Sequence, residues 1–436
     1  MKHYTKDFSL FLTGNNNRLY PALLILSAIT VYFPILGNDF LYSWDDQWMV
    51  MNEYTEGGIN FRNIKLILTS ISHGQYMPVN FLEFLFLYSI VGYNAFYFHL
   101  LSLVLHISCI YFVYAIIVKM FHQTKRAQTF ITDGNIRTIA FVTALIFAVH
   151  PLNVEAVAWI SAIKVLNYAF FYLLATLTYL SYLRKEKPVY YFLTAVLFAL
   201  SFGSKEQAVT FSVWLLLMYY ILGYDLKQKK IWIQIIPFFL LSLFFGFIVL
   251  NSSDRNDYNV DDLYPLWQRF VLACYSLVEY LTKFVFPYKL LYIYPFPMAA
   301  GEPLPSWLLV YPPLIFIFFV TLKNQLLRKP YVFGSLFFLL HIVICLHIIP
   351  LSRFAVVADR YIYMAGIGLA FIIAYCLALA TERWQGWKRN LTVAAAVCLF
   401  LYWGIFSNLR CRDWRDSESI KKEFMEMRKT EKDEEK

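Results

Sequence analysis

Two adjacent carboxylates form the strongest candidate for chemistry in this sequence. They are Asp45 and Asp46 of a Trp-Asp-Asp-Gln motif at residues 44–47, which lies shortly after an apolar segment. Adjacent carboxylates raise each other's proton affinity, and one beside a surface of low dielectric constant can accept a proton from a hydroxyl or hold a divalent cation. The alternative interpretation is a pair of solvated loop acids without a function.

A second set of polar and ionisable side chains lies near the ends of other apolar segments. Its members are His99, His150, Glu155, Lys164, Lys205, Glu206, Arg353, Asp359 and Arg360. If these segments cross a membrane, ionisable groups at such depths are costly and are usually paired or functional. Clustered lysines and arginines near a bilayer surface could neutralise a lipid phosphate or diphosphate. The structural alternatives are lysines that snorkel toward water, a Lys–Glu contact at 205–206, and an Arg360 that only neutralises Asp359.

The composition indicates the environment of these residues. The 436-residue chain is 59% apolar and only 15% charged, with a mean hydropathy of +0.53. A soluble domain carries about 25% charged residues, so this departure predicts a polytopic membrane protein. The net charge of +9 is then expected in cytoplasmic loops, and no nucleic-acid partner is predicted. The six cysteines have no paired spacing that would indicate a disulfide or zinc framework.

The apolar runs predict an all-α bundle of about eleven transmembrane helices. A bilayer core of about 30 Å needs about 20 mostly apolar residues per helix, and fewer suffice where a helix is packed inside a bundle. The predicted spans are 20–36, 95–118, 136–149, 164–183, 189–203, 208–223, 231–250, 307–322, 331–349, 361–380 and 391–406. Two further apolar stretches, 76–92 and 270–286, are predicted to be interfacial or re-entrant helices, because counting only one of them as a span would place basic clusters outside.

This arrangement predicts the orientation of the chain. Residues 1–19 form a cytoplasmic N-terminus that leads into a retained first span, 20–406 form the membrane domain, and 407–436 form a charged tail on the outer side. The outer loop 37–94 is too long for a simple connector and is expected to be functional, and 251–306 form a second outer segment. The sequence has no Walker A, GxGxxG, HExxH or GxSxG motif, so soluble-type nucleotide, hydride and protease chemistry lack support.

Several sequence blocks accompany the acid pair in chain order. They are SHGQYMPV at 72–79, NAFYFHLLS at 94–102 followed by His106, FAVHPLNVEAVAWIS at 147–161, SKEQ at 204–207 and ADRYIYMAGIG at 358–368. In these blocks the chain resembles the GT-C superfamily of polytopic glycosyltransferases that use polyprenyl-phosphate sugars. It most closely resembles the membrane part of the transmembrane-and-TPR O-mannosyltransferase-like family. The chain departs from the family where Met77 replaces an arginine, where Ile-Lys-Val at 163–165 replaces Arg-Lys-Asp, and where TPR repeats do not follow the last predicted span.

The resemblance implies an inverting sugar transfer at the outer face of the membrane. It implies that Asp45, with Asp46 as its neighbour, is the general base. It also implies a group that binds the departing lipid phosphate, namely Arg360, Lys205, Arg353 and Lys164. Supporting roles in orienting the loop or the donor are expected for His73, Tyr76, His150, Glu155, Glu206 and Asp359. No cofactor is expected to be obligatory, although some superfamily members use a divalent cation, so Mg²⁺ or Mn²⁺ at Asp45 and Asp46 stays an option.

The expected partners follow from the same resemblance. The donor would be a polyprenyl-phosphate-linked sugar, mannose or a similar hexose, and the acceptor a protein Ser/Thr hydroxyl or a glycan. Membrane lipids surround the chain, and an accessory protein could replace the TPR surface. The expected location is a bacterial inner membrane with the site facing the periplasm, with an endoplasmic reticulum membrane as the alternative. Two other function classes stay open: a lipid-linked saccharide transporter or flippase, and a non-catalytic GT-C-like scaffold.

Overall fold

The computed structural model describes residues 19–123, 133–252, 264–299, 301–348, 355–422 and 425. Within these ranges the regular structure is helical, and the two β-bridges are isolated residue pairs. The protein is therefore an all-α polytopic membrane protein, as the composition predicts. Arg353 and, in the C-terminal tail, residues 423–424 and 426–436 lie outside the described residues.

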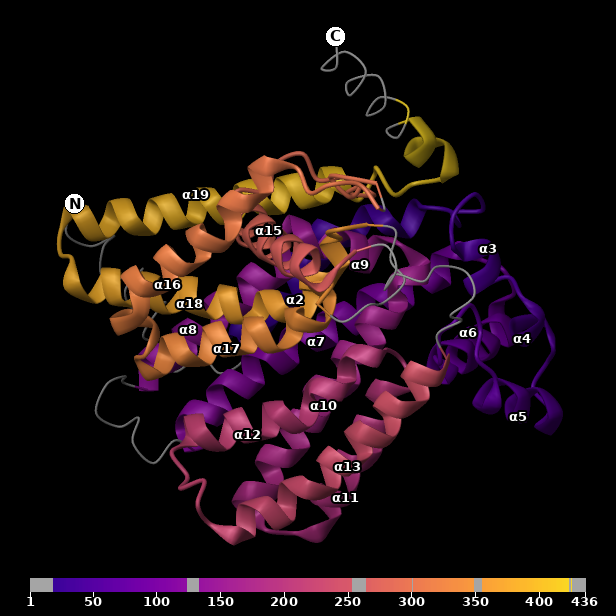
Figure 1. Ribbon diagram of the computed structural model, residues 1–436, viewed down its shortest axis with the longest axis horizontal. Helices are drawn as coiled ribbons and strands as arrows, with labels where there is room; N and C mark the ends of the chain where they lie inside the picture. The colour runs from indigo at the N-terminus through magenta and orange to yellow at the C-terminus, as the bar shows by residue number, and fades with distance from the viewer. Residues whose placement is uncertain are drawn as a thin grey trace.

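The α-helices differ widely in length (Figure 1). They are α2 (Leu19–Tyr32), α3 (Asp46–Met49), α4 (Glu53–Glu56), α5 (Phe61–Thr69), α6 (Pro78–Val91), α7 (Ala95–Gln123), α8 (Asp133–Val149), α9 (Val154–Ala158), α10 (Ile163–Lys185), α11 (Pro188–Phe202), α12 (Phe211–Leu222), α13 (Lys229–Ser252), α15 (Leu266–Val285), α16 (Tyr311–Leu326), α17 (Lys329–Ile342), α18 (Ile362–Arg383) and α19 (Trp387–Arg410). Short 3-10 helices connect several of them: η1 (Phe33–Gly37), η3 (Pro151–Asn153), η4 (Ile160–Ala162), η5 (Glu206–Thr210), η6 (Ser306–Val310), η7 (Val343–Cys345) and η8 (Asp359–Tyr361).

Each of the eleven predicted spans coincides with a helix, but not all are full-length spans. Among the described residues, seven helical segments are long and apolar enough to cross a membrane: Leu19–Gly37, Ala95–Gln123, Ile160–Lys185, Lys229–Ile248, Ser306–Leu326, Asp359–Arg383 and Trp387–Arg410. An eighth span would consist of Asn135–Val149 and Pro151–Ala158, which are bent by 57°. The remaining three predicted spans correspond to the shorter apolar helices Pro188–Phe202, Glu206–Leu222 and Lys329–Cys345. The 20-residue helix α15 is not among the candidate spans, in agreement with its predicted place outside the spans.

Local sequence explains where several helices begin and end. Proline stands in the first turn of α6, α11, α16 and α17, where its missing N–H would be unpaired in any case. Gly223 ends α12 with a φ of +80°, a left-handed conformation that glycine adopts without strain. Helices α17 and α18 pack closely at Gly334 and Gly368, where an added Cβ on Gly368 would lie only 2.3 Å from the Gly334 carbonyl oxygen.

The helices place several loop regions at one end of the bundle. In Figure 1 the short helices α3 to α6 lie at the right-hand end, and the turn between α18 and α19 lies at the opposite end. Helix α19 runs back along the bundle, so its last residues lie near the first loop, as the hydrogen bond from the Asp39 backbone N–H to the Arg415 carbonyl shows (2.8 Å). We call the end of the bundle that holds α3 to α6 and the last residues of α19 the site end.

Candidate functional site

The acid pair divides into one buried and one partly exposed carboxylate. Asp46 has 0% exposed surface and accepts three hydrogen bonds. Its Oδ2 receives the Leu41 backbone N–H (2.8 Å), and its Oδ1 receives the Ser161 backbone N–H (3.0 Å) and the Ser161 hydroxyl. Burial raises the pKa of Asp46 to about 6, although these hydrogen bonds oppose the rise. Asp46 therefore ties the first loop to η4.

Asp45 remains available for chemistry. It is partly exposed at the start of α3, and no hydrogen bond to its carboxylate is found within the described residues. It lies close enough to Lys164 and Arg360 to interact electrostatically with both. Asp45 is thus an acid that has no side-chain hydrogen bond among the described residues and lies near cations from two other segments.

A tight turn brings the first loop against Lys164. The backbones of Ser72 and Gln75 exchange two hydrogen bonds (3.0 and 2.9 Å), and His73 and Gly74 between them have φ values of +47° and +67°. Positive φ at both central positions is the type I′ geometry, which suits glycine at the second position. The turn places the Gln75 Oε1 3.2 Å from the Lys164 Nζ. The ammonium group also lies 5.9 Å from the centre of the Trp48 ring.

Lys205 approaches the same place from the connection between α11 and η5. Its side chain is only 6% exposed, and its Nζ lies 4.0 Å from the Glu206 Oε1 and 5.8 Å from the Tyr361 ring centre. Lys205 and Lys164 interact electrostatically, as do Lys164 and Glu206. Two lysines from separate helix ends therefore converge. Lys205 has Glu206 as its acidic neighbour, and Lys164 has Asp45.

Arg360 completes the convergence from η8. Its side chain is 20% exposed, and its Nη1 pairs with the Glu155 Oε1, while its backbone N–H donates to the Glu155 Oε2 (2.7 Å). The guanidinium lies over the rings of Trp159 (5.3 Å) and Tyr361 (4.9 Å). Glu155 therefore uses both oxygens to orient Arg360, and guanidinium donors other than Nη1 can still reach an anion.

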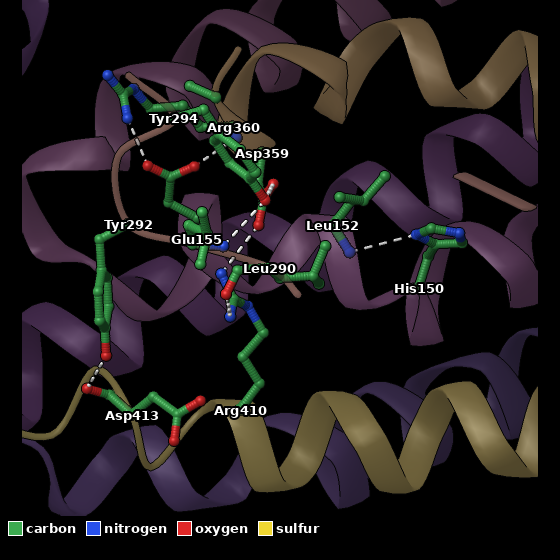
Figure 2. A network of polar contacts seen from close by, with 12 residues as sticks. His150, Leu152, Glu155, Leu290, Tyr292, Tyr294, Asp359, Arg360, Arg410 and Asp413 are labelled. Atoms are coloured by element: carbon green, nitrogen blue, oxygen red, sulfur yellow. Dashed lines mark hydrogen bonds and ion pairs between the residues drawn. The ribbon is translucent and has the colours of Figure 1, made fainter. Parts of the chain in front are cut away.

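Asp359 has a structural environment. It is fully buried, pairs with the Arg410 Nη2 (2.9 Å) and accepts the Tyr294 hydroxyl (2.8 Å), as Figure 2 shows. Asp359 is therefore paired with Arg410, and the suggestion that Arg360 only neutralises Asp359 does not hold. The Arg410 Nη1 also donates to the Leu290 carbonyl (2.7 Å).

His150 marks the 57° bend and has both ring nitrogens in use. Its Nδ1 accepts the Leu152 N–H (3.3 Å), as Figure 2 shows, so its Nε2 donates to the Phe284 carbonyl (2.8 Å). The ring stacks on Phe284 and contacts Trp403. In this arrangement His150 holds the bend, and neither of its ring nitrogens is free to bind a sugar donor.

The remaining predicted residues lie at the edge of this cluster. Tyr76 donates its hydroxyl to the Leu68 carbonyl (3.0 Å) and so fastens the turn to the end of α5. The His73 ring contacts the Trp48 ring at a tilt of 41° (4.3 Å between ring centres). Met77, at the position of the family's arginine, is buried and 2% exposed.

The residues present do not favour a metal ion bridging the acid pair. Both Asp46 oxygens already accept hydrogen bonds, so this carboxylate cannot turn toward an ion beside Asp45 without breaking them. Within the described residues, no group of three or more His, Cys, Asp or Glu side chains has the arrangement of a metal site. The cations that surround Asp45 are those of lysine and arginine.

Sequence reasoning did not assign roles to four residues of the site. Gln75, Trp48 and Trp159 contact the lysines and Arg360, and Arg410 pairs with Asp359. Gln75 and Trp159 lie inside the sequence blocks that carry the family resemblance, and this is the signal that could have identified them. Arg410 lies beyond the last predicted span, and only its distant partner indicates its importance.

Comparison with known proteins gives matches to one kind of membrane enzyme. The chain is similar to Protein O-mannosyl-transferase TMTC1 from mouse and from human, at 33% identity over 167 residues in each case. The matched segment covers 36% of this chain, 16% of the mouse protein and 17% of the human protein. No protein-family model matches the chain, and no solved structure matches it significantly. The two matches confirm the resemblance to a TMTC-like membrane glycosyltransferase of the GT-C type.

Proposed function

We propose that this chain is an inverting glycosyltransferase that moves a hexose, such as mannose, from a polyprenyl-phosphate donor to a hydroxyl group. The observation that carries the proposal is the convergence of one available acid, Asp45, with Lys164, Lys205 and Arg360 at one end of the bundle. Such a transfer requires a proton acceptor beside cations that can bind a departing phosphate. The name of the TMTC1 proteins, which describes O-mannosyl transfer to protein, supports the same class of reaction.

The proposed step uses each residue in a defined way. The acceptor O–H gives its proton to the Asp45 carboxylate while its oxygen forms a bond to the anomeric carbon of the sugar. The bond from that carbon to the phosphate oxygen breaks on the opposite face, and its electron pair stays on the phosphate. Arg360, Lys205 and Lys164 would stabilise the charge that grows there. Asp46, Glu155 and Gln75 would hold the reacting groups in place, and no step requires a metal ion.

The proposed topology follows from the basic loops of the sequence. The site end would face the outside, which is the periplasm for a bacterial inner membrane, and the N-terminus would be cytoplasmic. The first outer loop, 37–94, would carry the base and the turn against Lys164. The acceptor would be a protein Ser/Thr or a glycan, which an accessory protein could present.

The test is sugar transfer by the purified protein from synthetic polyprenyl-phosphate mannose, with a short panel of other sugars and of peptide and glycan acceptors. The variants are Asp45→Asn and Arg360→Ala, and the matched control is Glu53→Gln, an exposed acid in the same loop. Turnover by the wild type and the control, with loss in both site variants, would support the proposal. Retention of activity in EDTA would support the proposed metal-independent reaction.

Three other results would contradict the proposal. Donor binding without turnover on any acceptor would favour the non-catalytic scaffold. Movement of the intact lipid-linked sugar across a vesicle membrane, without transfer, would favour the transporter. Absence of any binding to the donor would reject the donor class.

A further inference from the structure

The chain segment that begins at the end of α19 contacts the surroundings of Arg360 at two places. One contact passes through Asp359 and the other through Trp159. We propose that Arg410 and Trp414 are positioning residues that hold Arg360 in the geometry needed to bind the donor phosphate. This inference rests on the function proposed above, because it assigns a role within the same site.

The first contact is a buried ion pair. Arg410 is 3% exposed and its Nη2 lies 2.9 Å from the Asp359 Oδ2 (Figure 2). Asp359 is the residue directly before Arg360 and shares the short helix η8 with it. Arg410 therefore neutralises the carboxylate of the residue next to Arg360 and holds in place the short helix η8 from which the Arg360 side chain extends.

The second contact is an aromatic layer. The Arg360 guanidinium lies 5.3 Å from the Trp159 ring centre, and the Trp414 ring stacks on Trp159 with 5.7 Å between centres and 21° between planes. Trp414 is buried and also meets Tyr292 edge to face at 4.7 Å. Trp414 therefore supports the ring on which Arg360 rests.

Hydrogen bonds hold this segment against the first loop. The Asn38 amide donates to the carbonyls of Cys411 (2.9 Å) and Trp414 (3.1 Å). The N–H of Ser43, which lies only two residues before Asp45, donates to the Ser417 hydroxyl (3.1 Å). The segment thus joins the proposed base and the proposed phosphate ligand, which come from opposite ends of the sequence.

Removal of the Arg410 charge has a specific electrostatic consequence. Asp359 would be left beside Glu155 as a buried carboxyl group without its ion-pair partner, and such a group tends to take up a proton. At a pH high enough to ionise Asp359, Arg360 would be attracted by two acids instead of one and would be withdrawn from the donor. Removing the Asp359 charge as well would abolish this competition.

The experiment measures donor KM and kcat separately for the purified full-length chain. At a pH that keeps Asp359 ionised, Arg410→Gln should raise the donor KM by about tenfold or more, and the double variant Asp359→Asn/Arg410→Gln should return it to within about threefold of the wild type. Trp414→Ala should raise the donor KM, whereas Trp414→Phe, which keeps an aromatic ring, should change it little. The control is Arg412→Gln, because Arg412 is exposed two residues after Arg410.

The readout separates positioning from general stability. A purely structural role would lower the thermal unfolding midpoint and the active fraction, and hence the apparent kcat, without changing the donor KM. An unchanged donor KM in Arg410→Gln, or a double variant no better than the single one, overturns the inference while the glycosyltransferase proposal stands. If Arg410→Gln does not fold, the two Trp414 variants decide, and an equal donor KM in both overturns the inference. A wild type without transfer activity overturns both proposals.

Discussion

Asp46 and Asp45 should respond in opposite ways to substitution, although they are neighbours in the sequence. Asp46→Ala removes the acceptor for the backbone N–H groups of Leu41 and Ser161 and for the Ser161 hydroxyl, all in a buried place. An unpaired buried donor costs roughly 1–3 kcal/mol, so the three together should lower the free energy of unfolding by about 3–5 kcal/mol after local relaxation. Asp45→Asn removes no such contact and should change stability by less than about 0.5 kcal/mol.

Asp45→Asn should be the more stable variant but the less active one, when activity is expressed per folded protein. Loss of a general base lowers kcat by about 10²–10⁴-fold, so Asp45→Asn should be folded and nearly inactive. Thermal unfolding in detergent, followed by tryptophan fluorescence, gives the stability, and sugar release from the lipid-linked donor gives the activity. The division of roles is refuted if Asp46→Ala unfolds at the wild-type midpoint. It is equally refuted if Asp45→Asn keeps wild-type kcat.

Three further predictions concern other parts of the molecule. Burial raises the pKa of Asp46 from 3.8 to about 6, so the folded state binds this proton more tightly than the unfolded chain, and stability from this group is present at low pH and lost as the pH rises through about 6. From about pH 4 to 7, the unfolding free energy of the wild type relative to Asp46→Asn should therefore fall by up to about 3 kcal/mol, and a constant difference would contradict the assignment. The Phe61 side chain of α5 is 84% exposed, and we expect this short helix to lie at the membrane interface, so a tryptophan in Phe61→Trp should be quenched by brominated lipids in a bilayer more strongly than one in Thr69→Trp; equal quenching would contradict this placement. Gly368→Ala would place a Cβ 2.3 Å from a carbonyl oxygen of α17 and should destabilise the bundle by about 1–3 kcal/mol, whereas Gly246→Ala, with no atom within 4 Å of its Cβ, should not.

The positions of the helices were predictable because an apolar helix is specified by its own residues, whereas only seven or eight of the eleven predicted spans are, within the described residues, long enough to cross a membrane. Continuous apolar runs located every predicted span at a helix, including the 15-residue α11, which falls short of the bilayer thickness. The bend at His150 was not predicted. Pro151 is a local signal for a helix end, but the hydrogen bond from His150 at the bend goes to the Phe284 carbonyl, 134 residues away, which the sequence around His150 does not indicate.

The sequence predicted which residues belong to the site better than it predicted what each of them does. Asp45 and Asp46 look equivalent in the sequence, and their difference in burial depends on Ser161, 115 residues later. Asp359 and Arg360 were considered as a pair, whereas each has its own partner, Arg410 and Glu155 respectively. Sequence patterns predict which charged residues lie at one end of the bundle. The pairing among these residues is decided by tertiary contacts between segments far apart in the chain.

The pairing has a consequence for the proposed chemistry. The three cations Lys164, Lys205 and Arg360 have three acidic neighbours, Asp45, Glu206 and Glu155. In the proposed transfer the acceptor proton would neutralise Asp45 while the departing lipid phosphate gains one negative charge. The net charge of the site would therefore stay constant as negative charge moves from the carboxylate to the phosphate past the same cations. Since the compensation is internal, the step would need no proton from solvent, and the cations would stabilise the phosphate most strongly when Asp45 no longer competes for them.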